Sequence, residues 1–278
     1  MRTLVNIVKV TFFSSLIVAT ITLTGCGNDQ TKNLANAVDS IAAANQQSLT
    51  EAENMIKTFP TSFEVVDLLN KSGASYIFDI TNPISNAGKY ETIKKQALNW
   101  GIYGIDLCYS ATFNQKKETT NFLAVNQDLV KKLDISNAFD ASINDRINKN
   151  FATKDSLMNI FTTQFSGIYS SLIKTSRSNI AALSISGAVI EGVYLSSQLT
   201  TFAKDKTELK KIIAGQKDKF LKLVALLSLY KDDADVQEVL GKVKEINTQY
   251  STITETMSDD QLNAFIKTVE GVRNEFIK

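Results

Sequence analysis

The fold is decided by two apolar stretches of the chain, ALNWGIYGIDLCY at residues 97–109 and IAALSISGAVIEGVYLSSQL at residues 180–199. Each stretch contains a single charged residue, Asp106 in the first and Glu191 in the second. A helix that is apolar on nearly all sides must be covered by protein on nearly all sides. We therefore expect two central helices, with the rest of the chain packed around them.

Each stretch also carries a polar stripe at helical spacing. A carboxylate inside an apolar helix is costly unless it is paired or protonated. We therefore predict that the two helices face each other across a buried polar cluster that holds Asp106 and Glu191, with Arg177 as the nearest counter-ion in sequence. The stripes consist of Asn99, Tyr103, Asp106 and Ser110 on the first helix, and of Ser184, Gly187, Glu191, Tyr194 and Gln198 on the second.

Small residues accompany both stripes and would let the two backbones approach closely. They are Gly101, Gly104 and Cys108 on the first helix, and Ala188, Gly192 and Ser196 on the second.

Three roles are open for the predicted cluster. The favoured one is a satisfied hydrogen-bond network that sets the packing register of the two helices. The second is a pocket for a small polar or cationic ligand, or for a hard cation such as Ca²⁺ or Mg²⁺. The third, paired carboxylates in an acid-base enzyme, needs an open cleft that nothing else in the chain suggests.

The remaining pattern predicts an all-α protein. Apolar residues recur at helical spacing almost everywhere after Thr31, and the chain holds only 2 prolines. We expect a compact antiparallel bundle or an irregular helical solenoid of about nine to ten helices. The expected elements are a first helix ending before Pro60, a short helix through Asn70, and helices at about 89–113, 117–133, 137–150, 154–175, 178–203, 206–230, 233–255 and 259–277.

Local signals refine these boundaries. Ser258 with Gln261, and Asp205 with Glu208, have capping-box spacing. Ser136 and Ser178 are the predicted N-caps of their helices. Residues 75–83 are apolar and aromatic between turn formers, so we expect an extended strip across the bundle or a lone short strand.

The first helix has two interpretations. Its apolar stripe fits either the first helix of the bundle, which we favour, or a stalk that lifts the body away from a membrane. The stripe consists of Leu34, Val38, Ile41, Asn45, Leu49, Ala52 and Ile56.

The N-terminus has the pattern of a secretory signal peptide. Arg2 and Lys9 precede an apolar run that ends in Leu-Thr-Gly before Cys26. This ending resembles the lipobox of bacterial lipoproteins, which implies cleavage before Cys26 and acylation of its sulfur. We expect a signal peptide at 1–25, a lipidated tether at 26–30 and a single helical domain at 31–278. By the same resemblance, Gly27 favours the outer membrane, with the periplasmic or external face left open.

Composition excludes several function classes. The chain has no histidine, so histidine-based triads, histidine general bases and HExxH zinc sites are absent. The net charge of +1, with mixed signs, offers no basic face for nucleic acid. No phosphate-binding glycine motif or cysteine cluster is found, so no cofactor or metal is expected. We expect Cys108 to be a small buried residue of the core.

The segments at 95–107, 154–157 and 187–194 resemble a family of uncharacterised all-helical lipoproteins of Gram-negative bacteria, to which no activity is assigned. The resemblance implies an all-helical envelope protein and adds no mechanism. We therefore expect a non-enzymatic outer-membrane lipoprotein that serves as a helical scaffold, assembly or accessory protein. Its expected partners are the membrane, through the lipid, and an envelope protein. The alternative is a small-molecule or cation-binding lipoprotein that uses the Asp106/Glu191 cluster.

Overall fold

The computed structural model describes residues 28–59, 63–140 and 142–278, with side chains described for Ser40 and from residue 42 onward. The predicted signal peptide and Cys26 lie outside the described residues. The chain divides into two compact units, residues 1–44 and residues 45–278. The predicted domain boundary after residue 30 stays a prediction.

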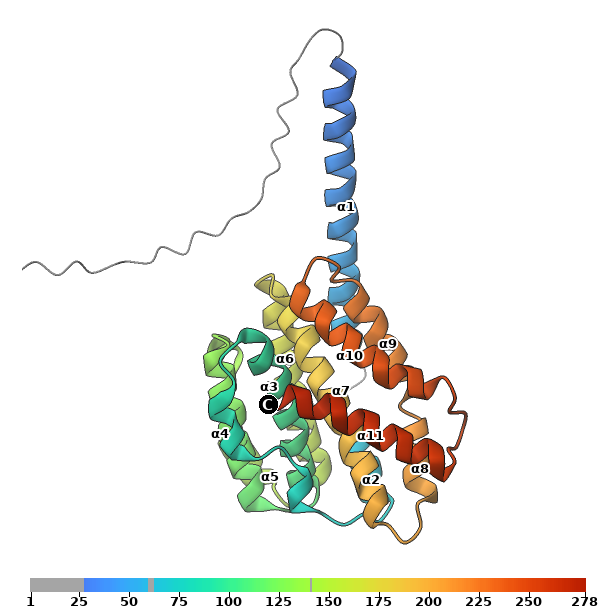
Figure 1. The fold of residues 1–278 in the computed structure, drawn as a ribbon. Coiled ribbons are helices and arrows are strands. Elements are labelled where there is room, and N and C mark those ends of the chain that lie inside the picture. The colour runs from blue at the N-terminus through green and yellow to red at the C-terminus, as the bar shows by residue number, and fades with distance from the viewer. Residues whose placement is uncertain (1–27, 60–62, 141) are drawn as a thin grey trace, which may run out of the picture. The chain divides into compact units, whose positions relative to one another are not determined.

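The all-α fold is confirmed, and the described residues contain no strand. The described residues form eleven α-helices, and a long connection with two 3-10 helices joins α2 to α3 (Figure 1). They are α1 (Asn28–Thr58), α2 (Phe63–Lys71), α3 (Ile93–Thr112), α4 (Lys116–Lys132), α5 (Ile143–Asn150), α6 (Lys154–Lys174), α7 (Ser178–Phe202), α8 (Thr207–Ala214), α9 (Lys217–Ser228), α10 (Ala234–Tyr250) and α11 (Asp259–Phe276), with 3-10 helices η1 (Phe78–Ile80), η2 (Ile84–Lys89) and η3 (Ser136–Ala138).

The two apolar stretches form the central helices, α3 and α7, which pack against each other along their length. Every residue from Gln96 to Thr112 is buried in α3, and every residue from Ile180 to Ser197 is buried in α7. Helix α7 is long and apolar enough to span a membrane, but its apolar window is buried inside the body. It is therefore the core helix that the composition predicts.

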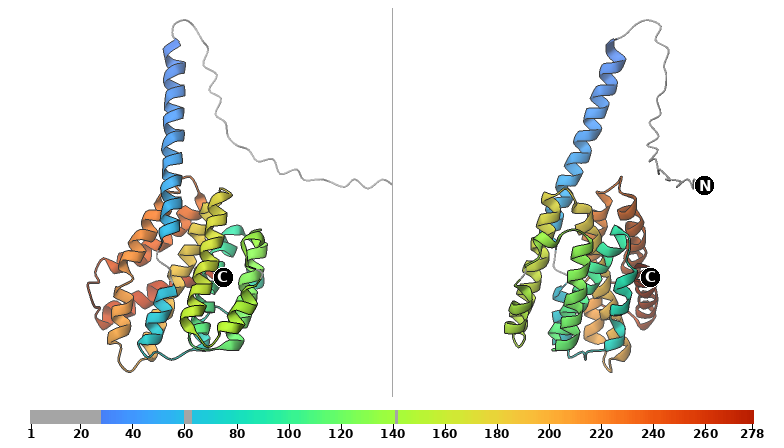
Figure 2. Two further views of the ribbon diagram at one scale, coloured as in Figure 1. Left: turned by 180° about the vertical axis from the view of Figure 1, so that it is seen from behind. Right: turned by 90° about the vertical axis from the view of Figure 1, so that its left-hand side faces the viewer.

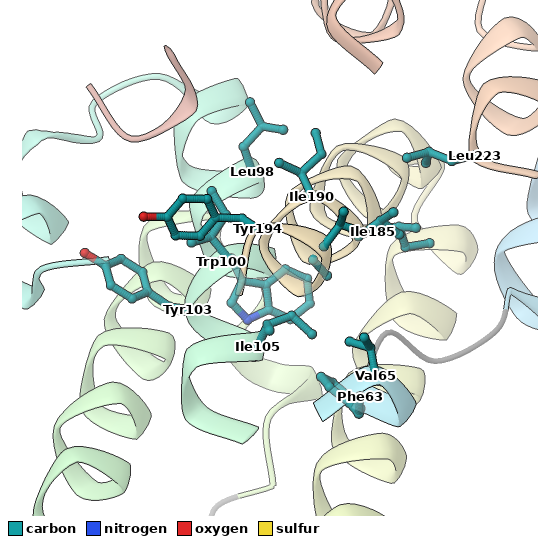
Figure 3. Close-up of a cluster of buried hydrophobic side chains, with 14 of the residues drawn as sticks. Phe63, Val65, Leu98, Trp100, Tyr103, Ile105, Ile185, Ile190, Tyr194 and Leu223 are labelled. Atoms are coloured by element: carbon teal, nitrogen blue, oxygen red, sulfur yellow. The ribbon is translucent and has the colours of Figure 1, made fainter. Parts of the chain in front are cut away.

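The other helices of the body surround this pair. Helix α4 packs on α3, helices α8, α9 and α10 pack on α7, and helices α2, α6 and α11 pack on both. Most of these helices run along one common direction (Figure 2). Apolar side chains from α2, α3, α7 and α9 meet between them (Figure 3).

Two glycines allow α3 and α7 to come into backbone contact. A Cβ atom added to Gly101 would overlap the carbonyl oxygen of Ser184, and one added to Gly187 would overlap that of Leu98. Gly104, predicted to serve the same contact, instead accommodates α6, because its added Cβ would lie 2.6 Å from Cζ of Phe165. The close approach of the two helices therefore depends on one glycine from each.

Among the side chains that the structure describes, the first helix enters the core near its C-terminal end. Ala52 and Ile56 are buried, whereas Leu49 is 39% exposed. The bundle interpretation is therefore confirmed for α1 from Ala52 onward. For its earlier residues, both interpretations stay predictions.

The prediction of an extended strip or strand at residues 75–83 is wrong in its local conformation. The segment contains η1 and is followed directly by η2. The segment is held along α3, because Ile77 N donates to the Tyr109 hydroxyl at 2.9 Å and Pro83 O accepts from the Tyr103 hydroxyl at 2.8 Å. These hydrogen bonds to side chains take the place of a strand partner.

Several helix boundaries also differ from the prediction. The capping box of Ser258 and Gln261 is present at the start of α11. The predicted helix 206–230 is broken between α8 and α9, and helix 137–150 is replaced by η3 and α5. The predicted N-cap interactions of Ser136 and Ser178 are not formed. Asp205 does accept the backbone N–H of Thr207 at 2.9 Å at the start of α8.

Candidate functional site

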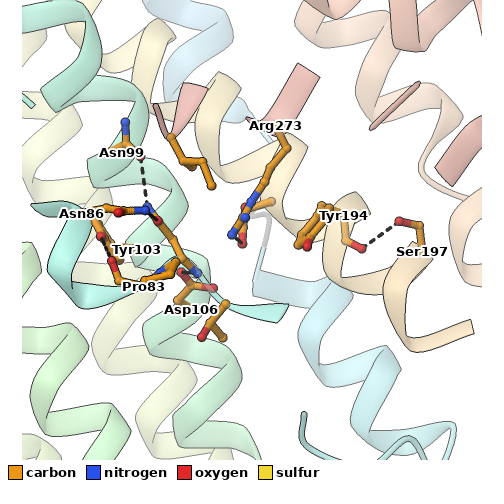
Figure 4. Close-up of polar contacts among 12 residues, drawn as sticks. Pro83, Asn86, Asn99, Tyr103, Asp106, Tyr194, Ser197 and Arg273 are labelled. Carbon is orange, nitrogen blue, oxygen red and sulfur yellow. Dashed lines mark hydrogen bonds and ion pairs between the residues drawn. The ribbon is translucent and has the colours of Figure 1, made fainter. Parts of the chain in front are cut away.

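The two isolated acids of the central helices lie in one buried cluster. Asp106 on α3 and Glu191 on α7 are both 0% exposed. Glu191 lies close enough for the charge of its carboxylate to raise the pKa of Asp106. The cluster lies where α3, α7, α11 and the segment around Pro83 come together (Figure 4).

Arg273 of α11 is the counter-ion of Glu191. Its Nε lies 2.9 Å from Oε2, and its Nη2 lies 2.9 Å from Oε1, which is the bidentate geometry of a strong pair. The guanidinium carbon lies 4.3 Å from the centre of the Tyr194 ring. The arginine charge is thus covered by a carboxylate on one side and an aromatic face on another.

The prediction of Arg177 as counter-ion is wrong. Its guanidinium donates to the carbonyl oxygens of Leu133 at 2.6 Å and Asp134 at 3.2 Å, in the turn after α4. A signal for Arg273 was present in the sequence, because it falls four residues after Val269 and three before Phe276, within the buried stripe of α11. An arginine in such a stripe needs a buried acid.

The surroundings of Asp106 favour its neutral form. Burial and the neighbouring Glu191 carboxylate raise the pKa of Asp106 well above its usual range, against the opposing effects of Arg273 and the Asn82 N–H. Its Oδ2 accepts that N–H at 3.0 Å, whereas Oδ1 accepts no hydrogen bond. A protonated Asp106 adds no charge to the Glu191–Arg273 ion pair, whose two charges balance each other.

Asn82 is a central member of this network that sequence reasoning missed. Its side chain is fully buried, and its Nδ2 donates to the Tyr90 hydroxyl at 3.0 Å and to Oδ1 of Asn99 at 3.2 Å. Its Oδ1 accepts from Nδ2 of Asn86 at 2.9 Å. The residue precedes Pro83 in a connecting segment, where no periodicity marks it as buried.

The same network holds the C-terminus of the chain. Nδ2 of Asn99 donates to the carbonyl oxygen of Phe276 at 2.8 Å, and the Tyr90 hydroxyl donates to that of Ile277 at 3.3 Å. Nζ of Lys95 lies 3.1 Å from the carbonyl oxygen of Lys278. The last carbonyl groups of α11 therefore receive donors from the start of α3 and the segment before it.

Tyr103 joins the network at its edge. Its buried hydroxyl donates to the Pro83 carbonyl, and its own carbonyl accepts from Nδ2 of Asn126 at 2.9 Å. Burial raises the pKa of Tyr103 far above that of a free phenol. Tyr103 therefore links α3 to the Pro83 segment through its neutral hydroxyl donor, and to α4 through its carbonyl acceptor.

Three side chains of the predicted stripes do not join the cluster through a described contact. The Ser110 hydroxyl donates to the Leu107 carbonyl at 2.9 Å and accepts from the Thr119 hydroxyl at 3.1 Å. The hydroxyl of Ser184 lies 3.4 Å from that of Tyr169 on α6, and Gln198 is half-buried near the end of α7. The stripe on α7 spans more of the helix than one cluster occupies, so only Glu191 and Tyr194 reach it.

Other chemically active groups are few in the part of the chain that the structure describes. Cys108 is a free, fully buried thiol, and burial raises its pKa well above the usual range. Within the described ranges, no group of three or more Cys, Asp or Glu residues is placed to hold a metal ion. The cluster is thus a balanced hydrogen-bond network that joins α3, α7, α11 and the segment around Asn82.

No family model, curated protein or solved structure matches the chain. The resemblance to helical lipoproteins therefore stays a prediction.

Proposed function

We propose that the protein is a non-enzymatic lipoprotein of the outer membrane, whose helical body serves as a scaffold, assembly or accessory subunit for an envelope partner. The observation that carries this proposal is that both buried acids are engaged in contacts within the body. Glu191 is paired with Arg273, and Asp106 accepts the Asn82 N–H in surroundings that favour its neutral form. Residues that would be the first candidates for catalysis are thus occupied in holding the body together.

The membrane address is supported by the sequence. A lipobox-like ending before Cys26 predicts that acyl chains on this residue attach the body to a membrane, and several chains at one residue make attachment stable. Gly27 after the cysteine favours the outer membrane.

The alternative, a ligand site at the Asp106/Glu191 cluster, is less well supported. Both carboxyl groups are fully buried, and a ligand would have to displace the Arg273 pair or the Asn82 N–H. Opening such a pair leaves uncompensated buried charge, which is strongly unfavourable.

Lipid attachment is tested by growing cells that express the full chain with radiolabelled palmitate. We expect label in the protein and recovery with outer membranes, whereas a Cys26→Ala variant should be unlabelled. Equal labelling of the Cys26→Ala variant would contradict acylation at this residue.

The partner is tested by crosslinking intact cells and isolating the full chain. We expect a specific envelope protein with the wild type and its loss with Cys26→Ala, because an unanchored body is no longer held at the membrane. Repeated recovery of no specific partner would count against a scaffold or accessory role.

A further inference from the structure

A second feature of the body lies apart from the polar cluster, and it is a cavity of about 120 Å³. It opens between the end of α1, the start of α2, and helices α6 and α7. Its apolar lining includes Phe63, Phe165, Tyr169, Ile185 and Ala188. An apolar cavity of this order, about 150 Å³, is large enough to bind one benzene ring.

The walls of the cavity are held by aromatic packing behind them. The Phe165 ring stacks on Trp100 with centroids 5.1 Å apart and meets the Phe63 ring edge-on at 5.2 Å. Its tip lies against Gly104, where a side chain would collide with it. Tyr169 is fixed between Trp100, at 5.6 Å, and the Ser184 hydroxyl. Collapse of the cavity would require this cluster to repack.

The polar groups of the lining indicate which chemical group a ligand would place at the mouth of the cavity. Lys57 is the only charged residue in the lining, and it is exposed to solvent. The hydroxyl groups of Ser166 and Ser170 also line the cavity from exposed positions on α6. A ligand with an apolar ring and a negative group would match the apolar interior with its ring and the Lys57 charge at the mouth with its negative group.

We propose that this cavity binds a small aromatic carboxylate of one ring, with the ring against Phe165 and Tyr169 and the carboxylate facing Lys57. The site is separate from the Asp106/Glu191 cluster, since neither acid lines it. It goes beyond the scaffold role, and its occupancy does not depend on an envelope partner.

The chain contains a built-in probe for this site. Trp100 is its only tryptophan and stacks on Phe165, which lines the cavity. The experiment uses the full chain in phospholipid nanodiscs, so that no detergent competes, and titrates it with sodium benzoate while Trp100 fluorescence is recorded. Benzyl alcohol serves as the neutral ligand of similar size. Titrations of empty nanodiscs with the same ligands serve as the baseline.

Two variants block the cavity in different places, Ser166→Phe at the mouth and Ala188→Leu in the interior. Ser166→Phe adds a ring at the mouth from an exposed position, so it should fold normally, and Thr163→Phe adds the same ring at an exposed position of α6 outside the lining. Ala188→Leu fills the interior. Lys57→Gln removes the charge, and Lys174→Gln is its control on α6.

We expect saturable benzoate binding that Ser166→Phe and Ala188→Leu abolish and Thr163→Phe preserves. Lys57→Gln should weaken benzoate binding by about two- to fivefold, as for a solvent-accessible ion pair, and leave benzyl alcohol unchanged. Absence of a saturable response to benzoate at ~10 mM would overturn the proposal, a range that allows for the weak binding of small ligands. Unchanged benzoate binding in a folded Ser166→Phe variant would also overturn it.

Discussion

Arg273 in α11 binds Glu191 in α7 through two nitrogen atoms, although the residues are 82 positions apart in the chain. The arginine and glutamate side chains are 5% and 0% exposed. Their pairing fastens the last helix to the central one, and the Arg273 charge partly opposes the rise in the pKa of Asp106. The four predictions below follow from this network and from the helix contact that surrounds it.

Breaking the Glu191–Arg273 pair should be strongly destabilising. Either Glu191→Gln or Arg273→Met leaves one buried charge without its partner, which costs about 3–5 kcal/mol of unfolding free energy. Urea unfolding of each variant at pH 7 measures this. Arg146→Ala, which breaks the half-exposed pair with Asp140, is the control and should cost much less. Costs as small as that of the control would mean that the buried pair adds nothing to stability.

Asp106→Asn should gain stability relative to the wild type as the pH rises. The pKa of Asp106 is raised in the folded protein. The contribution of Asp106 to stability is therefore fully present below its pKa in the unfolded chain, about 4, and is lost as the pH rises toward its pKa in the folded protein. The loss is at most about 1.4 kcal/mol per pH unit. Urea unfolding from pH 4 to pH 8 should show the difference between variant and wild type widening.

Asp140→Asn is the control of opposite sign. Hydrogen bonds from Ser142 and Arg146 lower the pKa of Asp140 to about 2. The contribution of Asp140 to stability is therefore present above the pKa of the unfolded chain and is lost as the pH falls. The variant should be less stable than the wild type at neutral pH, and the difference should disappear at low pH. If Asp106→Asn followed the same trend, the assignment of a neutral Asp106 would be wrong.

Adding one methyl group at the α3–α7 contact should force the central helices apart. In Gly101→Ala the new Cβ would overlap backbone atoms of Ser184, which cannot rotate away. We expect a loss of about 3 kcal/mol or more, the upper range for overpacking. Gly241→Ala in α10 meets nothing within 4 Å and should instead stabilise by about 0.5–1 kcal/mol. Thermal unfolding of both variants tests the contrast, and equal effects would refute close backbone contact.

Removing the Asn82 amide should destabilise the body without touching either buried charge. Asn82→Ala leaves Oδ1 of Asn99 without its donor, at a cost of about 1–3 kcal/mol for an unsatisfied buried group. The Asn82 backbone N–H still donates to Asp106 in this variant. Urea unfolding measures the cost, with Asn263→Ala on the exposed face of α11 as the control. A change within ~0.5 kcal/mol, as at an ordinary surface position, would contradict the role of Asn82.

The sequence was informative about the central helices because burial leaves a local mark. The two nearly uncharged stretches predicted α3 and α7, and the isolated acids within them predicted where polar contacts must form. It was less informative about Asn82 and Arg273. Asn82 lies in a segment without periodicity, and Arg273 could be matched to Glu191 only by knowing that α11 packs on α7.

The sequence by itself therefore determined the helical class, the identity of the core helices and the presence of two acids that need partners. These properties depend on spacing within one helix, which three- and four-residue periodicity records directly. Only the tertiary structure decided that Arg273 rather than Arg177 pairs with Glu191, that Asn82 binds Asp106, and that a cavity remains beside Phe165. These depend on which surfaces far apart in the chain meet, and no local pattern of residues encodes that choice.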